Sequence, residues 1–212
     1  RAHASEMIGL QEVSTILDTV REKNPVLVDE VLKTANIPVS TIEKVLRNLL
    51  EEKVSIRNIV TILETLANYA SVTKNPWELT EKVREALGLQ ICMQYADQDD
   101  KKLRVMRLSQ DFSELVQNHA YYPPDGSKPY VAFDPVDRRK WIKSISDSLS
   151  RVNEKGYQPI ILCVSAVRQL VKSAIEREMP GVVVLSDMEL MAAGRSISIE
   201  IIDRIEQIEE DM

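Results

Sequence analysis

The stretch that decides the fold of the first part of the chain is VSIRNIVTILETLANYASVTKNPWELTEKVREALGLQI, residues 54–91. Its apolar residues recur every three or four positions, which is the spacing of one buried face of an α-helix. Ser55 can cap a first helix, and Asn75 followed by Pro76 is typical of a second helix start. Gly88 is placed to end that second helix in a left-handed conformation. The stretch therefore predicts two amphipathic helices joined by a short loop.

The residues before this stretch continue the helical pattern. An apolar stripe from Ile8 to Val20 ends at the breaker Lys23-Asn24-Pro25, where Asn24 can cap a short helix that stops before Pro38. Several residue pairs along the whole chain have the spacing of a capping box, in which each side chain satisfies the other's free backbone amide. These pairs are Ser40 with Glu43, Asn75 with Glu78, and Ser186 with Glu189. Residues 5–88 are therefore predicted to be all-helical.

The pattern changes after Gly88, where short apolar runs with strand character appear. A buried strand, an amphipathic helix and a second buried strand follow one another, which predicts a strand-helix-strand unit. The predicted strands cover residues 103–108, 159–164, 182–185 and an edge strand at 196–202, and the predicted helices cover 109–119, 134–155 and 165–178. We therefore predict an α+β protein: an N-terminal all-helical subdomain, residues 1–92, and a small α/β subdomain with a mixed sheet and an acidic C-terminal tail, residues 93–212.

The composition is that of an ordinary globular protein, with 44% hydrophobic and 28% charged residues. A net charge of −6 gives no positive field that would attract nucleic acid. Cys92 and Cys163 lie in apolar runs and are expected to be buried free thiols. No apolar run reaches the length of about 20 residues that a membrane span needs, and no signal peptide opens the chain. Because the chain begins at Arg1 rather than methionine, we expect it to be part of something longer.

Residues with catalytic chemistry are scarce. His3 and His119 are the only histidines, and the six glycines are scattered singly rather than gathered in a phosphate-binding loop. His119 could bind a metal with an aspartate brought in by folding, but a lone histidine at a helix end is more often a surface residue. We therefore expect no catalytic residues, no cofactor and no metal site.

A basic cluster, Arg138 to Lys143 with Trp141 inside it, offers a different class of function. Such a cluster could bind nucleic acid by charge and stacking, as in a helical, winged-helix-like module. At helical spacing, however, Trp141, Ile145 and Leu149 form an apolar stripe that leaves the cations outside. We favour a docked helix at this position and expect no nucleic-acid partner.

Residues 54–91 closely resemble the C-terminal cytosolic domain of the FlhA family of flagellar export-gate proteins. Further stretches agree in order: HASEMIGLQEVSTILD from His3, VLRNLLEEK from Val45, and IEREMP leading into VVVLSDMEL. Related gates of virulence-type III secretion systems share this layout and remain the alternative. The loop from Tyr121 to Tyr130 and the acidic tail after Ile202 depart from the family pattern.

The resemblance implies that this chain corresponds to the last two cytosolic subdomains of an export-gate protein. In that family the cytosolic domains form a nine-membered ring that docks export substrates, their chaperones, the ATPase complex and other export-gate subunits. The implied location is the cytoplasmic face of the bacterial inner membrane, with membrane contact only through an N-terminal part absent from this chain. The resemblance implies no catalytic residues.

We therefore expect the protein to act through surfaces that bind other proteins. The candidate partner or ring surface is the polar side of the helix expected from Ser55, together with the first helix of the chain. The alternative is that Glu12 and Arg57 only form ion pairs within the domain, each worth less than about 1 kcal/mol at a surface. The residues of this candidate surface are Gln11, Glu12, Arg57, Asn58 and Glu64.

Overall fold

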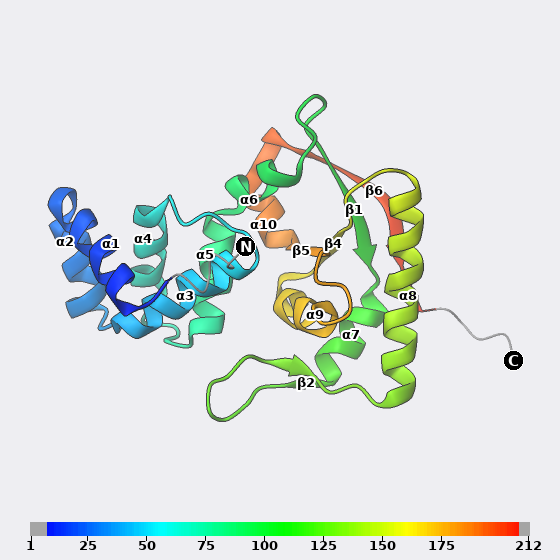
Figure 1. The fold of residues 1–212 in the computed structure, drawn as a ribbon, viewed down its shortest axis with the longest axis horizontal. Helices are drawn as coiled ribbons and strands as arrows, with labels where there is room; N and C mark the ends of the chain where they lie inside the picture. Colours follow the sequence, from blue (N-terminus) through cyan, green and yellow to red (C-terminus); the bar gives the residue numbers. More distant parts are fainter. Residues whose placement is uncertain (1–7, 208–212) are drawn as a thin grey trace, which may run out of the picture. The chain divides into compact units, whose positions relative to one another are not determined.

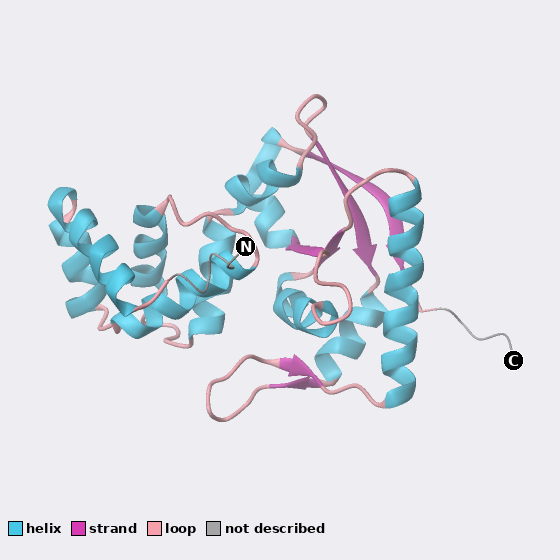
Figure 2. Cartoon of the chain, viewed as in Figure 1, coloured by secondary structure: helices cyan, strands magenta, loops and turns pink. Residues whose placement is uncertain are grey.

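The chain divides into two compact units in the computed structural model, which describes residues 8–207. The first unit comprises Arg1–Ile91 and the second Cys92–Met212, so the division falls one residue before the boundary that the sequence predicts. Figure 1 traces the chain, and Figure 2 shows that the first unit is built of helices whereas the second combines helices with strands. Within the described residues, no helix is long and apolar enough to cross a membrane.

The first unit is all-helical, as predicted, and its helices are joined by short loops. The turn η2 is π-helical, and α6 runs across the boundary into the second unit. The elements are α1 (Leu10–Lys23), α2 (Pro25–Asp29), η2 (Glu30–Thr34), α3 (Val39–Glu51), α4 (Ile59–Tyr69), α5 (Pro76–Ala86) and α6 (Gly88–Tyr95).

Helix α3 is central to the packing of the first unit, because it contacts both α1 and α5. One face of this helix is apolar, with Ile42, Val45, Leu46 and Leu49 fully removed from solvent and Leu50 partly buried. Helix α4 packs against α5 and buries Ile62. The 3.6-residue periodicity of the sequence therefore identified the core of this unit correctly.

The predicted cap at Asn75 is confirmed, but its capping box is not. The Asn75 side chain accepts the backbone N–H groups of Trp77 (2.8 Å) and Glu78 (3.4 Å). The amide of Asn75 instead donates to the hydroxyl oxygen of Thr73 at 3.1 Å, and that hydroxyl donates to the Glu78 carboxylate. The Thr73 hydroxyl thus bridges the Asn75 amide and the Glu78 carboxylate, which a capping box would have joined directly.

The box predicted at Ser40 and Glu43 is wrong. Helix α3 is preceded by Pro38, whose ring fixes an extended approach and whose carbonyl accepts the N–H of Ile42 at 3.2 Å. Ser40 therefore lies within the first turn rather than at the cap. The Glu43 carboxylate faces Arg47 instead, at 3.3 Å from Nε.

The helix that starts at Pro76 ends beside Gly88, as predicted, but the left-handed conformation predicted for Gly88 is wrong. Helix α5 ends at Ala86, and Gly88 begins α6 without adopting a positive φ. Leu87 and Ile91 are both buried, and the amide of Ile91 donates to the Leu87 carbonyl at 2.9 Å. Burial of these side chains therefore overrides the local preference of glycine for a helix end.

The second unit contains a four-stranded sheet and the helices that pack on it. Its helices and strands follow the predicted order, with an additional two-stranded ribbon and α10. The elements are β1 (Lys102–Leu108), α7 (Gln110–Asn118), β2 (Ala120–Tyr121), β3 (Tyr130–Val131), α8 (Pro135–Glu154), β4 (Ile160–Cys163), η3 (Ser165–Val167), α9 (Arg168–Ile175), β5 (Val183–Ser186), α10 (Asp187–Ala193), η4 (Gly194–Ser196) and β6 (Ser198–Ile205).

The sheet has the strand order β5-β4-β1-β6, and each neighbouring pair within it is parallel. Antiparallel pairing occurs between β2 and β3, which form a separate ribbon rather than a strand of the main sheet. The α+β class is confirmed, and the strand-helix-strand unit is β4, α9 and β5. Parallel neighbours require long crossover connections, which α8 and α9 provide.

Both faces of the sheet are covered over β1 and β4. Met106 and Leu108 of β1, with Ile161 of β4, belong to one core cluster that also contains Phe112 of α7 and Trp141 of α8. Leu103, Val105 and Leu162 alternate with these residues and are buried as well. Burial on two faces is the usual condition of a parallel sheet and explains the continuous apolar runs in the sequence. Cys92 and Cys163 are buried free thiols, as predicted.

The last strand, β6, is at the sheet edge, as predicted, but its burial differs from the expected alternation. Ile199 and Ile201 are 47% and 41% exposed. The register with β1 shifts after Val105, where Ile202 is the extra residue, so the strand bulges. Because the bulge reverses the facing of the following side chains, Ile205 is buried in the core cluster. The acidic tail from residue 208 lies outside the described residues.

Candidate functional site

The candidate surface residues on the first helix are exposed at the start of α1. The Glu12 carboxylate accepts the backbone N–H of Gly9 at 2.9 Å, which satisfies one of the free amides at the helix start. Gln11 is exposed beside it. Glu12 thus has a structural role as a cap, in addition to presenting a negative charge to solvent.

The other half of the candidate surface is not helical throughout, which corrects the prediction of a helix from Ser55. Helix α4 begins at Ile59, and Arg57 and Asn58 lie in the loop before it. The hydroxyl of Ser55 accepts the N–H of Arg57 at 3.3 Å in a local turn, so Ser55 caps no helix. Glu64 lies on α4 itself and is exposed.

Gln90 explains why this loop does not continue the helix. Its side-chain amide donates to the Ser55 carbonyl at 3.0 Å and its side-chain oxygen accepts from Asn58. These two hydrogen bonds tie both ends of the loop to α6. A contact across 35 positions in the sequence gives no local signal, so the sequence predicted the helix start from Ser55 alone.

The structure leaves the charges of the candidate surface available. Among the ion pairs and hydrogen bonds of residues 8–207, none joins Gln11 or Glu12 to the residues near α4. Within that range, neither Arg57 nor Glu64 takes part in an ion pair. The alternative that Arg57 and Glu12 are used only in internal ion pairs therefore has no support in the described part of the chain.

The basic cluster on α8 is partly neutralised, and its aromatic residue is inaccessible. Arg138 pairs with Glu178, and Lys143 Nζ lies 2.9 Å from Asp147 Oδ2. Trp141 is fully buried, and its indole N–H donates to the carbonyl of Ala174 at 3.3 Å. The docked-helix interpretation is confirmed, because this tryptophan cannot stack on a base.

Helix α8 is fastened to β6 by a polar network. Arg151 donates from Nη2 to the Asp203 carboxylate at 2.9 Å, and the hydroxyl of Ser148 donates to the same carboxylate. Burial alone would raise the pKa of Asp203. The hydrogen bonds from Arg151 and Ser148 outweigh that effect, so the pKa of this carboxyl lies below its ordinary value of 3.8.

This network predicts a pH-dependent contribution to stability. Replacing Asp203 by asparagine should lower the free energy of unfolding at pH 7 by about 1.5–3 kcal/mol, the value of a hydrogen bond to a charged group. Because the pKa is depressed in the folded protein, the difference from wild type should persist above about pH 4 and shrink as the pH falls further. Urea titrations at a series of pH values measure this difference. Asp99→Asn, at an exposed position, is the control, and an equal effect in both variants would contradict the prediction.

A cavity of about 620 Å³ lies at the carboxyl ends of β1, β4 and β6. In open parallel sheets this edge is the usual place for a ligand. Arg107 and Arg204, partners in the register of β1 and β6, line it together with Glu114 and Glu206. Two positive and two negative side chains leave the lining without a clear preference for either charge.

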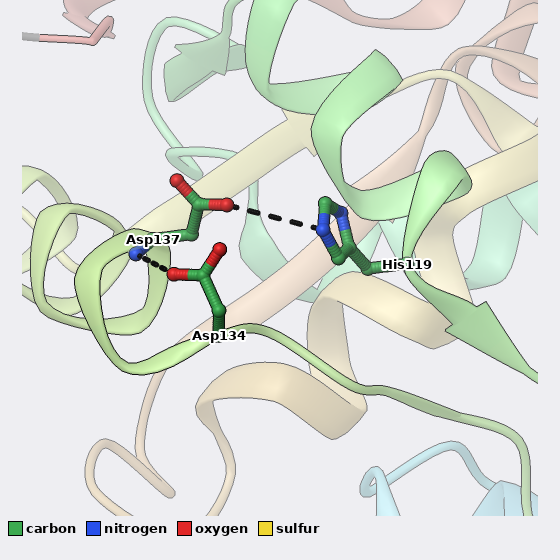
Figure 3. Close-up of side chains that lie close together, drawn as sticks. All are labelled: His119, Asp134 and Asp137. Atoms are coloured by element: carbon green, nitrogen blue, oxygen red, sulfur yellow. Dashed lines mark hydrogen bonds and ion pairs between the residues drawn. The ribbon is translucent and has the colours of Figure 1, made fainter.

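His119 lies closer to carboxylates than the sequence suggested. Its Nε2 atom is 3.9 Å from Asp137 Oδ2, and Asp134 lies beside both, as Figure 3 shows. One ligand atom from each of these side chains lies within 4.8 Å of the others. Asp134 caps α8, its side chain accepting the N–H of Asp137 at 2.8 Å, and this hydrogen bond is the main reason that the pKa of Asp134 lies below its ordinary value. The sequence offered Asp134, Pro135 and Asp137 only as a helix start.

Comparisons with known proteins agree with the resemblance in the sequence. Residues 1–194 match the FHIPEP family model. The flagellar biosynthesis protein FlhA of Bacillus subtilis (strain 168) is 36% identical over 203 residues, which cover 96% of this chain but only 29% of that relative. This chain therefore spans under a third of the length of that curated relative.

Solved structures share the fold. The Chlamydia pneumoniae CdsV protein, in its complex with CdsO, is 30% identical with a TM-score of 0.83, covering 96% of this chain and 57% of that one. The nonameric EscV cytosolic domain from a type III secretion system is 28% identical with a TM-score of 0.79, covering 96% of this chain and 58% of that one. The family match, the flagellar relative and the shared fold agree. The chain belongs to the FHIPEP family, the family of the flagellar export-gate protein FlhA.

Proposed function

We propose that this chain is a non-catalytic part of a flagellar protein export gate and acts by binding other proteins. The observation that carries the proposal is the 36% identity to a flagellar biosynthesis protein over 96% of the chain. The expectation of no catalysis rests on the sequence, which has only two histidines and two cysteines and no motif that combines a nucleophile with a base. A gate of a virulence-type system is the second candidate, supported by the likeness to CdsV and EscV.

The first part of this function is that of a ring scaffold. The EscV cytosolic domain, which shares this fold, was solved as a nonamer. A homo-oligomeric ring of more than two subunits joins one surface of each subunit to a different surface of its neighbour, so each subunit needs two complementary patches. The proposed location is the cytoplasmic face of the inner membrane, with membrane attachment through a part outside this chain, and the greater length of the Bacillus subtilis relative leaves room for such a part.

The second part is a docking platform. The complex of CdsV with CdsO supports the binding of a partner by a protein of this fold. The proposed partners are export chaperone-substrate complexes, the export ATPase complex and other export-gate subunits. The proposed contact residues, either with a partner or with the next subunit of the ring, are the exposed polar and charged residues Gln11, Glu12, Arg57, Asn58 and Glu64.

A pull-down tests this function directly. The bait is either this chain or a longer version that restores the upstream part of the protein, and the prey are flagellar chaperone-substrate complexes and the export ATPase complex. Capture by both baits would locate a docking surface within these residues. Capture by the longer version alone would leave this chain as scaffold and ring contact. If neither version captured any of the prey, the proposed function would fail.

Reversing charges on the candidate surface should weaken whichever contact it makes. Arg57→Glu combined with Glu64→Arg should reduce partner capture or ring assembly by about tenfold, because opposed like charges replace attraction at the contact. Binding is measured by surface plasmon resonance, and assembly by analytical ultracentrifugation of the longer version. Lys74→Glu, exposed in the same unit but outside the surface, should change neither. Unaltered binding and assembly in the double variant would exclude these residues from the interface.

A further inference from the structure

The group formed by His119, Asp134 and Asp137 has the composition and fixed geometry of a metal site. The three side chains come from two rigid elements: His119 directly follows α7, and the aspartates belong to the start of α8. Figure 3 shows the three side chains converging on one region. One nitrogen and two carboxylate oxygens form a donor set that suits a divalent transition ion, most commonly zinc.

The hydrogen bonding of His119 prepares one ring nitrogen as a ligand. Its Nδ1 atom lies 2.9 Å from the carbonyl oxygen of Leu115. A carbonyl can only accept, so in the neutral ring Nδ1 carries the hydrogen and Nε2 keeps its lone pair. Nε2 is the atom that faces Asp137. In most metal sites, the ring nitrogen that does not bind the metal donates its N–H to a carbonyl or carboxylate, which fixes the orientation of the histidine.

The charges of the two aspartates are only partly balanced. Within residues 8–207, no lysine or arginine pairs with Asp134 or Asp137, and His119 balances the charge of Asp137 only when its ring is protonated. The nearest cation in the sequence, Arg138, pairs with Glu178 instead. Two neighbouring carboxylates repel each other, and the partial positive charge at the start of α8, about half an elementary charge, offsets this repulsion incompletely. A divalent ion would balance it.

The distances suit coordination after small rotations. Zinc binds histidine nitrogen and carboxylate oxygen at about 2.0–2.2 Å, so two ligand atoms of a tetrahedral site lie about 3.4 Å apart. The distance between Nε2 and Asp137 Oδ2, 3.9 Å, is longer than this by about half an ångström. All the ligand atoms of the group lie within 4.8 Å of one another. Because the terminal torsion of aspartate is broad, turning the carboxylates closes the difference.

We propose that His119, Asp134 and Asp137 bind a divalent transition-metal ion, zinc in the first instance, in a structural site with water completing the coordination. The ion joins the end of α7 to the start of α8. The residues between its ligands form the β2–β3 ribbon, whose base is held by the hydrogen bond from Ala132 N–H to the His119 carbonyl at 2.8 Å. Bound zinc therefore closes this ribbon at its base.

Calorimetric titration of the 212-residue chain with zinc chloride tests the site. One zinc ion per chain is expected, and His119→Ala, Asp134→Asn and Asp137→Asn should each weaken binding by about tenfold or more. Asparagine caps helices as well as aspartate does, so Asp134→Asn loses the ligand charge without losing the start of α8. His3→Ala, at the other histidine, and Asp147→Asn, at a carboxylate farther along α8, are the controls and should bind as wild type does.

Hydrogen exchange provides a second measurement. Zinc should slow exchange of residues 120–133 in the wild-type chain and have no effect on them in His119→Ala. An absence of zinc binding by the wild-type chain would overturn the proposal. Binding that survives all three ligand substitutions, or that is lost in His3→Ala, would assign the zinc to another location and overturn it equally. The zinc measurements do not involve partner capture. They can therefore contradict the metal site without contradicting the proposed function, and the pull-down can do the reverse.

Discussion

Replacing Trp141 by alanine is expected to lower the free energy of unfolding of the second unit by about 3–5 kcal/mol, the range for removing a large buried aromatic side chain. Trp141 is fully buried in the core cluster of that unit. Phe112 meets it edge to face at a centroid distance of 5.3 Å, and Phe133 lies 5.5 Å away. The substitution removes both ring contacts and leaves the Ala174 carbonyl without its indole donor.

Hydrogen exchange resolved by peptide is the measurement for Trp141→Ala, because it reports on each unit separately. Protection should fall throughout residues 102–205. Tyr122→Ala is the matched aromatic control, since Tyr122 is 65% exposed and should cost little. Protection in Trp141→Ala equal to that of the control would show that the aromatic cluster does not hold this unit together.

Leu46→Ala is expected to have the second largest effect, a loss of about 2–5 kcal/mol in the first unit. Leu46 is fully buried on α3, the helix that contacts both α1 and α5. The cavity left by alanine therefore opens where three helices meet, and the close packing of a core limits how far they can collapse into it.

Tryptophan fluorescence measures this effect once only one tryptophan is present. In a Trp141→Phe background, Trp77 of α5 reports unfolding of the first unit during a urea titration. Val26→Ala in the same background is the control, because Val26 is 79% exposed. A midpoint for Leu46→Ala within error of the control would contradict the central position of α3.

Features set by neighbouring residues were predictable from the sequence. The Ser186 hydroxyl accepts the N–H of Glu189 and the Glu189 carboxylate accepts that of Ser186, as the spacing predicted, and Gly194 ends α10 at φ 59°. The β4, α9 and β5 elements were identified from buried apolar runs at either end of an amphipathic helix. In each case the deciding interaction lies within a few residues or follows from a simple period.

Features set by distant contacts were not predictable. Gly88 was expected to end α5 in a left-handed conformation because of its local preference, whereas burial of Leu87 and Ile91 continues the chain directly into α6. The loop before α4 depends on Gln90, far along the chain. The approach of His119 to Asp134 and Asp137 depends on how the ribbon returns the chain from α7 to α8. A single sequence does not show which residues far apart along the chain come into contact.

The candidate interaction surface was predictable only in part. Exposure of Gln11, Glu12 and Glu64 followed from helical periodicity and is found in the structure. The irregular backbone at Arg57 did not follow from it. The identity of the partner that binds these side chains depends also on the partner's own surface. A single sequence contains no information about that surface.

The strand order has a consequence for protein synthesis. The central strand β1 is the first strand of its unit to be made, yet it pairs with β4 and with β6, the last. Lys102 meets Ser198, so this sheet cannot be completed until almost the entire unit has left the ribosome. The helical first unit is compact on its own and precedes the second in the chain, so it can fold while the remainder is translated. During that interval the apolar side chains of β1 lack their neighbours, so the nascent second unit exposes apolar surface that the finished sheet buries.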